Sequence, residues 1–180
     1  MKKIIILLFI AISGQMLLNA QTAMDFYSKG VKKADKGDFI GAKDDFEKAL
    51  QIDPDYANAH NNLALILMHN FKDKEGAKMH YEKAIALAPN DPVAHFNYAV
   101  LLKDNYSDKV SAKKEFEKAI SLNPQFPEAH YNYAILLKDN FGDKDGAKRH
   151  YMKATSLNTK LVNPNFDVDF EIIRTRIDKF

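Results

Sequence analysis

The stretch AHNNLALILMHN at residues 59–70 decides the fold of this chain, because the chain contains it three times in related form. It returns as AHFNYAVLLKDN at residues 94–105 and as AHYNYAILLKDN at residues 129–140, each copy 35 positions after the one before. A second pattern follows each copy at the same spacing: GAKMHYEKAIAL, SAKKEFEKAISL and GAKRHYMKATSL. Similarity at one fixed period is typical of proteins built from stacked repeats.

The repeats have definite boundaries. Three blocks align without gaps, at residues 57–91, 92–126 and 127–161. An earlier block, residues 23–56, has the same plan with one residue fewer, and the missing residue lies in its turn at Lys36-Gly37. The sequence therefore predicts a repeat domain over residues 21–161 with about four copies.

Each block predicts two helices. In the first, Ala59, Leu63 and Leu67 share one face through their spacing of four residues. An aspartate begins each second helix, where it caps free N–H groups, and these are Asp38, Asp73, Asp108 and Asp143. An asparagine ends the first helix, where we expect a left-handed backbone, and these are Asn70, Asn105 and Asn140. Proline stops the second helix at Pro54, Pro89 and Pro124.

Small and aromatic residues recur at positions where helices approach closely. The second block has Ala64, Ala77, Tyr81, Ala84 and Pro89, and its neighbours repeat this spacing. The pattern resembles the tetratricopeptide repeat, over residues 23–161. The resemblance implies an all-α fold, a right-handed solenoid of helix–turn–helix units. The period of 35 exceeds the 34 of the family, and we expect the extra residue to lengthen the turn at Phe71, Tyr106 and Phe141.

The two ends of the repeat domain differ from its middle. Lys29 and Lys33 stand where the second block has leucine, which predicts a polar first helix whose face nothing covers. At the other end, residues 162–180 carry an apolar stripe at helical spacing, and we interpret them as a C-terminal capping helix. The stripe consists of Phe166, Phe170, Ile173 and Ile177.

The N-terminal segment, residues 1–20, has the order of a signal peptide. Lys2 and Lys3 precede nine apolar residues, and Ala20 offers a small residue at the cleavage site. Cleavage after Ala23 is the second choice, and an uncleaved anchor is the alternative that a longer apolar run would favour. We therefore expect export to a bacterial periplasm or cell surface, without membrane insertion after cleavage. The absence of cysteine excludes disulfides and a lipid-bearing cysteine.

Charge and motifs exclude several classes of function. Without Lys2 and Lys3 the chain has 24 basic and 24 acidic residues, so nothing attracts it generally to nucleic acid. The sequence lacks a cysteine nucleophile, a glycine-rich phosphate loop and metal-binding motifs, and it predicts no enzyme, cofactor or metal site. His60, His95 and His130 recur once per repeat, too far apart for one ion, and we expect each ring to lie between the helices of its own repeat.

The resemblance to the family also implies a binding surface. In tetratricopeptide proteins the first helices line a concave groove that often holds an extended peptide. Carried over by position, the groove residues of this chain are Asn62, Asn97, Asn132, Phe96, Tyr131, Lys103 and Lys138. An asparagine amide offers one donor group and one acceptor, as a peptide backbone does, so a row of them can hold a strand. The lysines that clamp a terminal carboxylate in some members are absent, with Met24, Asn58, Val93 and Glu128 in their places.

Two classes of function stay open at this point. The first is a scaffold that binds a protein or peptide in its groove. The second is a structural subunit of an envelope assembly that docks through its outer face or its C-terminal helix. The sequence identifies neither the partner nor the oligomeric state.

Overall fold

The computed structural model describes residues 21–163 and Phe166. The predicted signal peptide, residues 1–20, lies outside the described residues, and so does the predicted capping helix apart from residues 162, 163 and 166. The chain divides into two compact units, Met1–Pro89 and Asn90–Phe180, and each is described by itself.

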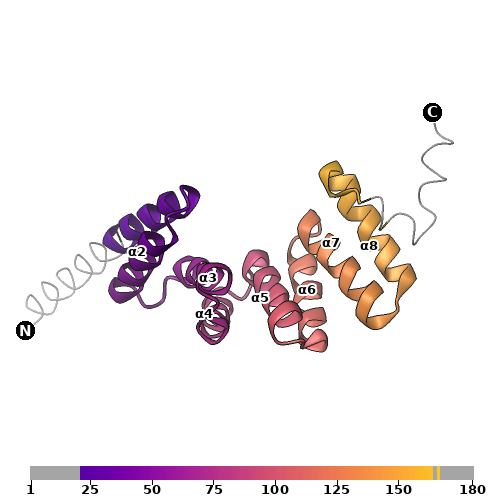
Figure 1. The fold of residues 1–180 in the computed structure, drawn as a ribbon, viewed down its shortest axis with the longest axis horizontal. Coiled ribbons are helices and arrows are strands. Elements are labelled where there is room, and N and C mark those ends of the chain that lie inside the picture. The colour runs from indigo at the N-terminus through magenta and orange to yellow at the C-terminus, as the bar shows by residue number, and fades with distance from the viewer. Residues whose placement is uncertain (1–20, 164–165, 167–180) are drawn as a thin grey trace, which may run out of the picture. The chain divides into compact units, whose positions relative to one another are not determined.

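The first unit contains two pairs of helices. A helix over residues 21–35 precedes α2 (Phe39–Ile52), and α3 (Ala57–Ile66) continues into a short π-helical segment, η1 (Leu67–Phe71), before α4 (Lys74–Leu87) (Figure 1). α3 packs against both α2 and α4. The unit therefore consists of the first two predicted repeats.

The second unit repeats this plan. α5 (Pro92–Asn105) pairs with α6 (Lys109–Leu122), and α7 (Pro127–Leu136) leads through the π-helical η2 (Leu137–Phe141) to α8 (Lys144–Leu157). A 3-10 turn, η3 (Thr159–Leu161), follows α8. α6 packs against α5 and α7, and α7 packs against α8. The described residues contain no strand, and the predicted all-α fold of paired helices is confirmed.

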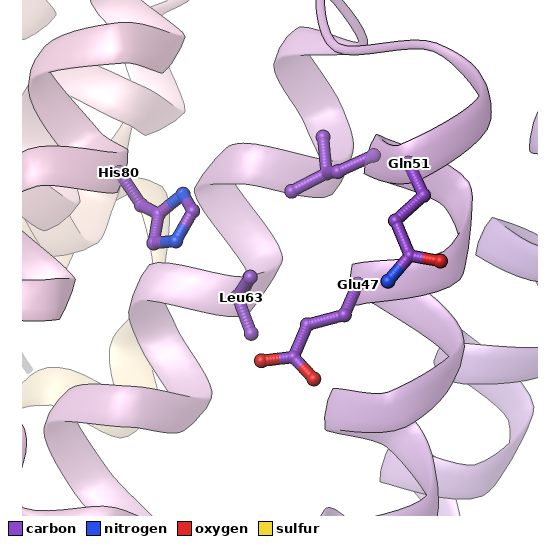
Figure 2. Close-up of a pocket in the computed structure, with 5 residues that line it drawn as sticks. Glu47, Gln51, Leu63 and His80 are labelled. Carbon is purple, nitrogen blue, oxygen red and sulfur yellow. The ribbon is translucent and has the colours of Figure 1, made fainter.

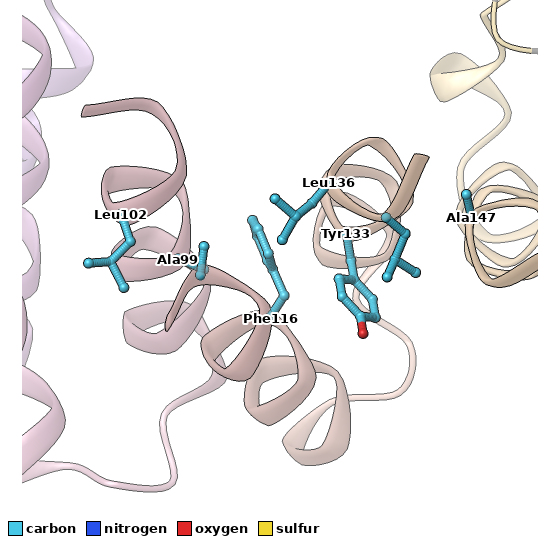
Figure 3. Packing of buried hydrophobic residues seen from close by; sticks show 8 residues of the cluster. Ala99, Leu102, Phe116, Tyr133, Leu136 and Ala147 are labelled. Atoms are coloured by element: carbon cyan, nitrogen blue, oxygen red, sulfur yellow. The ribbon is translucent and has the colours of Figure 1, made fainter. Parts of the chain in front are cut away.

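Alanines and aromatic residues make the core, as the repeat pattern predicts. In the second unit Phe116 lies between Ala99 and Leu136, with Tyr133 beside it on α7 (Figure 3). Ala99 and Phe116 are fully buried. Small side chains on facing helices let the backbones approach, and one large ring per repeat then fills the remaining space.

The aspartate caps are confirmed in all four repeats. Each carboxylate accepts a hydrogen bond from the backbone N–H three residues later, at distances of 2.8 to 3.0 Å. The pairs are Asp38 with Gly41, Asp73 with Gly76, Asp108 with Ser111, and Asp143 with Gly146.

The turn before each cap differs from the prediction. The left-handed residues in the later three repeats are Lys72, Ser107 and Gly142, with φ of 59°, 55° and 64°, and the predicted asparagines are not among them. Asn70 and Asn140 instead lie inside the π-helical segments η1 and η2. The extra residue of the 35-residue period is thus absorbed partly by widening the last turn of the helix, because a π turn takes one more residue than an α turn.

Backbone hydrogen bonds show the same widening. In the first repeat Asp38 N–H donates to Lys33 O, five residues back, as in a Schellman motif. In the fourth repeat Asp143 N–H donates to Leu137 O, six residues back, at 3.1 Å. The carbonyl at the end of the first helix therefore keeps its partner in both turns, although one turn is a residue longer.

The aromatic residues that end η1 and η2 have a packing role. The ammonium of Lys43, on α2, lies 5.9 Å from the centre of the Phe71 ring in the next repeat. Lys113, on α6, lies 5.1 Å from the centre of the Phe141 ring in the same relation. Such cation–π contacts join one repeat of a unit to the next.

The first helix is less simply polar than expected. The Lys33 ammonium is 2.7 Å from the Asp45 carboxylate on α2, and Asp45 is buried. Lys33 therefore forms an ion pair with α2, so the prediction of an uncovered polar face is wrong at this residue. The lysine replaces a leucine, but a buried aspartate opposite compensates its charge.

Phe166 alone represents the apolar stripe among the described residues. Its side chain is 4% exposed, and its ring stacks on Tyr151 with a centroid distance of 4.3 Å. The Tyr151 hydroxyl accepts a hydrogen bond from the Asn163 N–H at 2.7 Å. The chain after α8 therefore covers the buried ring of the fourth repeat at this point. Phe170, Ile173 and Ile177 lie outside the described residues.

Within the same described part of the chain, no helix combines the length and apolar character needed to cross a membrane.

Candidate functional site

The predicted groove residues lie on the first helices of the repeats. Asn62 belongs to the first unit, on α3, and the other six belong to the second. Asn97 and Phe96 lie on α5, whereas Asn132 and Tyr131 lie on α7. Because α5 contacts α7, the structure brings these two helices of the second unit together. All four of these side chains are half-buried.

The asparagines make hydrogen bonds within the chain. The Asn62 amide donates to the Tyr27 hydroxyl at 3.1 Å, which joins the first helices of the first two repeats. The Asn132 amide donates to the Glu128 carbonyl at 3.0 Å, one turn back on α7. The Asn132 Oδ1 atom has no hydrogen-bond donor among the described residues, so it remains an acceptor for a ligand.

The two aromatic residues pack with rings of their own repeat, and Tyr131 also packs with Phe166 beyond it. The Phe96 ring is 4.9 Å from that of Phe126 and 6.1 Å from that of Phe116. The Tyr131 ring is 6.1 Å from Tyr151 and 6.2 Å from Phe166. These contacts fix the ring positions while part of each ring stays exposed. Fixed rings are good contact surfaces, because little side-chain entropy is lost on binding.

The two lysines are already partly neutralised. The Lys103 ammonium lies 3.0 Å from the Asp104 carboxylate, and that of Lys138 lies 3.6 Å from Asp139. Their side chains are only 14% and 24% exposed. Lys138 also lies 4.6 Å from the centre of the Phe166 ring. Each lysine side chain therefore lies along the surface of its repeat and does not project into solvent as an unpaired cation.

One set of polar residues was missed by the sequence reasoning. The residue just before the buried aromatic of the second helix is titratable in all four repeats: Asp45, His80, Glu115 and His150. In each case it contacts the first helix of the same repeat. The signal was available, because a titratable side chain next to a buried ring in every repeat needs a partner.

Asp45 pairs with Lys33, and the partners in the later three repeats are the recurring histidines. The Nδ1 atoms of His60 and His80 are 2.8 Å apart, and those of His130 and His150 are also 2.8 Å apart. In the third repeat, the His95 Nδ1 atom is 2.5 Å from the Glu115 carboxylate. His60, His95 and His130 are at most 8% exposed. The predicted position of these rings between the helices of their own repeat is confirmed.

The Nε2 atom of His130 determines which nitrogen atoms of the His130–His150 pair carry hydrogen. The His130 Nε2 atom is 3.1 Å from the Pro124 carbonyl, which can only accept, so Nε2 carries a hydrogen. In neutral His130 the Nδ1 atom is then an acceptor, and the Nδ1–H of His150 donates to it. Burial lowers the pKa of both His130 and His150, and the nearby His130 contributes to the shift of His150. Burial likewise lowers the pKa of His80 in the first unit.

No group of three or more histidine, aspartate or glutamate side chains in the described chain is arranged to hold a metal ion. The paired histidines are hydrogen-bonded to each other through their Nδ1 atoms.

Models of known protein families match the chain over these helix pairs. A family model described as TPR repeat matches residues 32–70, and two models described as tetratricopeptide repeat match residues 57–91, and residues 80–112 and 115–155. The chain carries tetratricopeptide repeats. The matches agree with the helix pairs of both units. No curated protein sequence matches the chain.

Several solved structures are similar to this chain. A crystal structure of MamA protein is 25% identical, with a TM-score of 0.65 over 77% of this chain and 74% of MamA. PilF of Pseudomonas aeruginosa is 23% identical, with a TM-score of 0.70 over 78% of this chain and 63% of its own. The first TPR of Spaghetti (RPAP3), solved with an HSP90 peptide, is 23% identical with a TM-score of 0.62, over 66% and 93%. At these identities PilF and Spaghetti show the fold alone.

One similar structure is that of an enzyme, of which only a part matches. The O-GlcNAc transferase of Thermobaculum terrenum has a TM-score of 0.70 at 20% identity, and the chain spans 26% of its length. The similarity extends to a minor part of that protein and concerns the helical repeat fold.

Proposed function

We propose that this chain is an exported scaffold for protein–protein interaction, which holds an extended peptide of a partner along the first helices of its repeats. The observation that carries the proposal is the half-buried row on α5 and α7, where Asn97 and Asn132 stand beside the fixed rings of Phe96 and Tyr131. Asparagine oxygens such as Asn132 Oδ1 accept backbone N–H groups, and the rings supply apolar contact.

The similar structures support the protein-binding part of the proposal. The first TPR of Spaghetti was solved bound to an HSP90 peptide, so a domain of similar fold binds a short peptide. In the present chain the lysine side chains of the row are paired with aspartates. We therefore expect recognition through main-chain hydrogen bonds and aromatic contacts, with little dependence on salt.

The experiment is a pull-down with the full chain from extract of its source cells, followed by affinity measurement for the protein recovered. The double variant Asn97→Ala with Asn132→Ala removes up to two hydrogen bonds per residue and should weaken binding about tenfold or more, at roughly 0.5–1.5 kcal/mol per bond. Lys148→Ala, on α8, is the matched control and should bind like the parent. Melting of each variant separates lost binding from lost folding.

A second candidate function is a structural subunit of an envelope assembly, which docks through the outer face. Exposed apolar residues on the second helices favour it, with Val110 on α6 at 61% and Met152 on α8 at 51% exposure. If Val110→Ser or Met152→Ser loses the partner and the asparagine pair binds like the parent, this function replaces the first.

Export is part of the proposal and has its own test. N-terminal sequencing of the protein recovered from the envelope should begin at Gln21 or Met24. An intact Met1 on most molecules would favour a membrane anchor.

A further inference from the structure

The first unit has an open cleft that shares no residue with the predicted groove. Its volume is about 480 Å³, and its lining consists of Glu47, Leu50, Gln51, Leu63 and His80. Glu47 and Gln51 extend from α2, and His80 from α4, toward the space beside Leu63 on α3 (Figure 2). Sites that bind small ligands usually measure about 300–1,000 Å³, so the cleft is large enough for one ring-sized group.

The second unit repeats this lining 70 residues later. The corresponding residues are Glu117, Ile120, Ser121, Tyr133 and His150. Two positions differ clearly in side-chain size: Gln51 corresponds to Ser121, and Leu63 corresponds to Tyr133. A leucine therefore stands in the first unit where the second unit has a phenol ring.

Tyr133 shows how a phenol ring fits this lining. Its hydroxyl donates to the Glu117 carboxylate at 2.6 Å, and its ring meets the His150 ring edge-on with centroids 4.7 Å apart. Tyr133 is only 5% exposed. In the second unit, one tyrosine side chain thus provides a hydrogen bond to the Glu117 carboxylate and a ring contact to the His150 imidazole.

In the first unit, the same two groups have no such ring between them. One oxygen of Glu47 accepts a hydrogen bond from Lys43 at 2.6 Å, and within residues 21–163 the other oxygen, Oε2, has no donor. The Nδ1 atom of His80 is hydrogen-bonded to His60, and this bond fixes the orientation of the His80 ring. Leu63 is fully buried and forms the floor.

We propose that this cleft binds the phenol ring of a tyrosine carried by a protein partner, with the hydroxyl donating to Glu47 and the ring lying against His80. The cleft opens to the surface, so a side chain presented on a peptide can enter it. The protein nature of the ligand rests on the proposed scaffold function, whereas the choice of a phenol rests on the comparison of Leu63 with Tyr133. The site is separate from the asparagine row, so either can fail alone.

The test is an NMR titration of the full chain with N-acetyltyrosinamide, observing the His80 ring and the Leu63 methyl signals. N-acetylphenylalaninamide, which lacks the hydroxyl, should bind about tenfold more weakly, because a hydrogen bond to a charged group is lost. Leu63→Tyr should abolish the titration by placing a phenol in the cleft from within. Glu47→Gln should weaken binding severalfold, whereas the matched control Glu117→Gln should leave it unchanged.

Several results would overturn the proposal. Equal binding of the phenylalanine compound would remove the role of Glu47, and unchanged titration of Leu63→Tyr would place the ligand elsewhere. Shifts confined to Asn97, Asn132 and Tyr131 would assign the compound to the groove. If p-cresol binds and N-acetyltyrosinamide does not, the ligand of the cleft would be a free phenol and not a tyrosine on a peptide. An absence of shifts at His80 up to the solubility limit of the compound would also refute the site.

Discussion

Replacing His150 by glutamine is expected to make the second unit less sensitive to acid. Burial lowers the pKa of His150 and of His130 in the folded chain, whereas an unfolded chain gives histidine its usual pKa of about 6.5. The unfolded state therefore binds more protons just below pH 6.5. Stability from this pair is complete above about pH 6.5 and is lost as the pH falls through that value toward the lowered folded pKa.

The structure sets the size of the effect. One such group changes the free energy of unfolding by at most about 1.4 kcal/mol per pH unit. His150 is half-buried, and Glu117 and Asp143 favour its charged form while Arg149 opposes it. Solvent screening reduces the effect, so we expect about 0.7 kcal/mol between pH 6.5 and 5.5. In a chain of this length that is a change of roughly 2 °C in Tm.

Glutamine is a suitable replacement because its amide N–H can still donate to His130 without titrating. Thermal melts followed by circular dichroism at pH 7.5, 6.5 and 5.5 measure the difference. Glu115→His is the opposite variant, since it places a third histidine pair beside His95, and it should increase the loss in acid. If the parent and His150→Gln lose the same Tm between pH 7.5 and 5.5, or if Glu115→His loses less, the assignment of acid sensitivity to these pairs is wrong.

Three further outcomes are expected. Asp143→Ala should lower the free energy of unfolding by about 1 kcal/mol through loss of the α8 cap, with the exposed Asp139→Ala as control, and equal melts would exclude a capping role. Phe166→Ala should cost about 3 kcal/mol because its ring is buried on Tyr151, whereas the exposed Val110→Ala should cost little; an unchanged Tm for Phe166→Ala would mean that Phe166 does not cover the fourth repeat in solution. Deleting Asn140 should convert the π turn of η2 into the narrower turn of the first repeat and change stability by roughly 1 kcal/mol or less, and a loss of helix content by circular dichroism would show that the wider turn is required.

The helix pairs were predictable because their signals are local. The aspartate caps and the spacing of alanines and aromatics act within one helix or between adjacent ones, so one sequence is sufficient to place them. The path of the extra residue was not predictable in the same way. Asn70 has a side chain that tolerates a left-handed backbone, yet the chain adopts that conformation two residues later at Lys72. A π turn and a longer loop are both compatible with the same sequence pattern.

The candidate site was only partly readable from the sequence. The row on α5 and α7 follows from the repeat register, which places Asn97 and Asn132 at equivalent positions. The bond of Asn132 to Glu128 and the pairing of Lys103 with Asp104 depend on rotamers, which no spacing rule gives. The histidine pairs could have been predicted from the sequence, because His80 and His150 each immediately precede a buried tyrosine.

The widened turn also bears on the origin of the repeats by duplication. Only the first block has 34 residues, and the later three share the additional residue at the same place. One insertion in an ancestral repeat, copied by later duplications, accounts for this with a single event. The second and fourth repeats share the π turn and the histidine pair, which the third lacks. Leu63 and Tyr133 occupy equivalent positions in these two repeats, so the two units differ at a position that shapes the cleft.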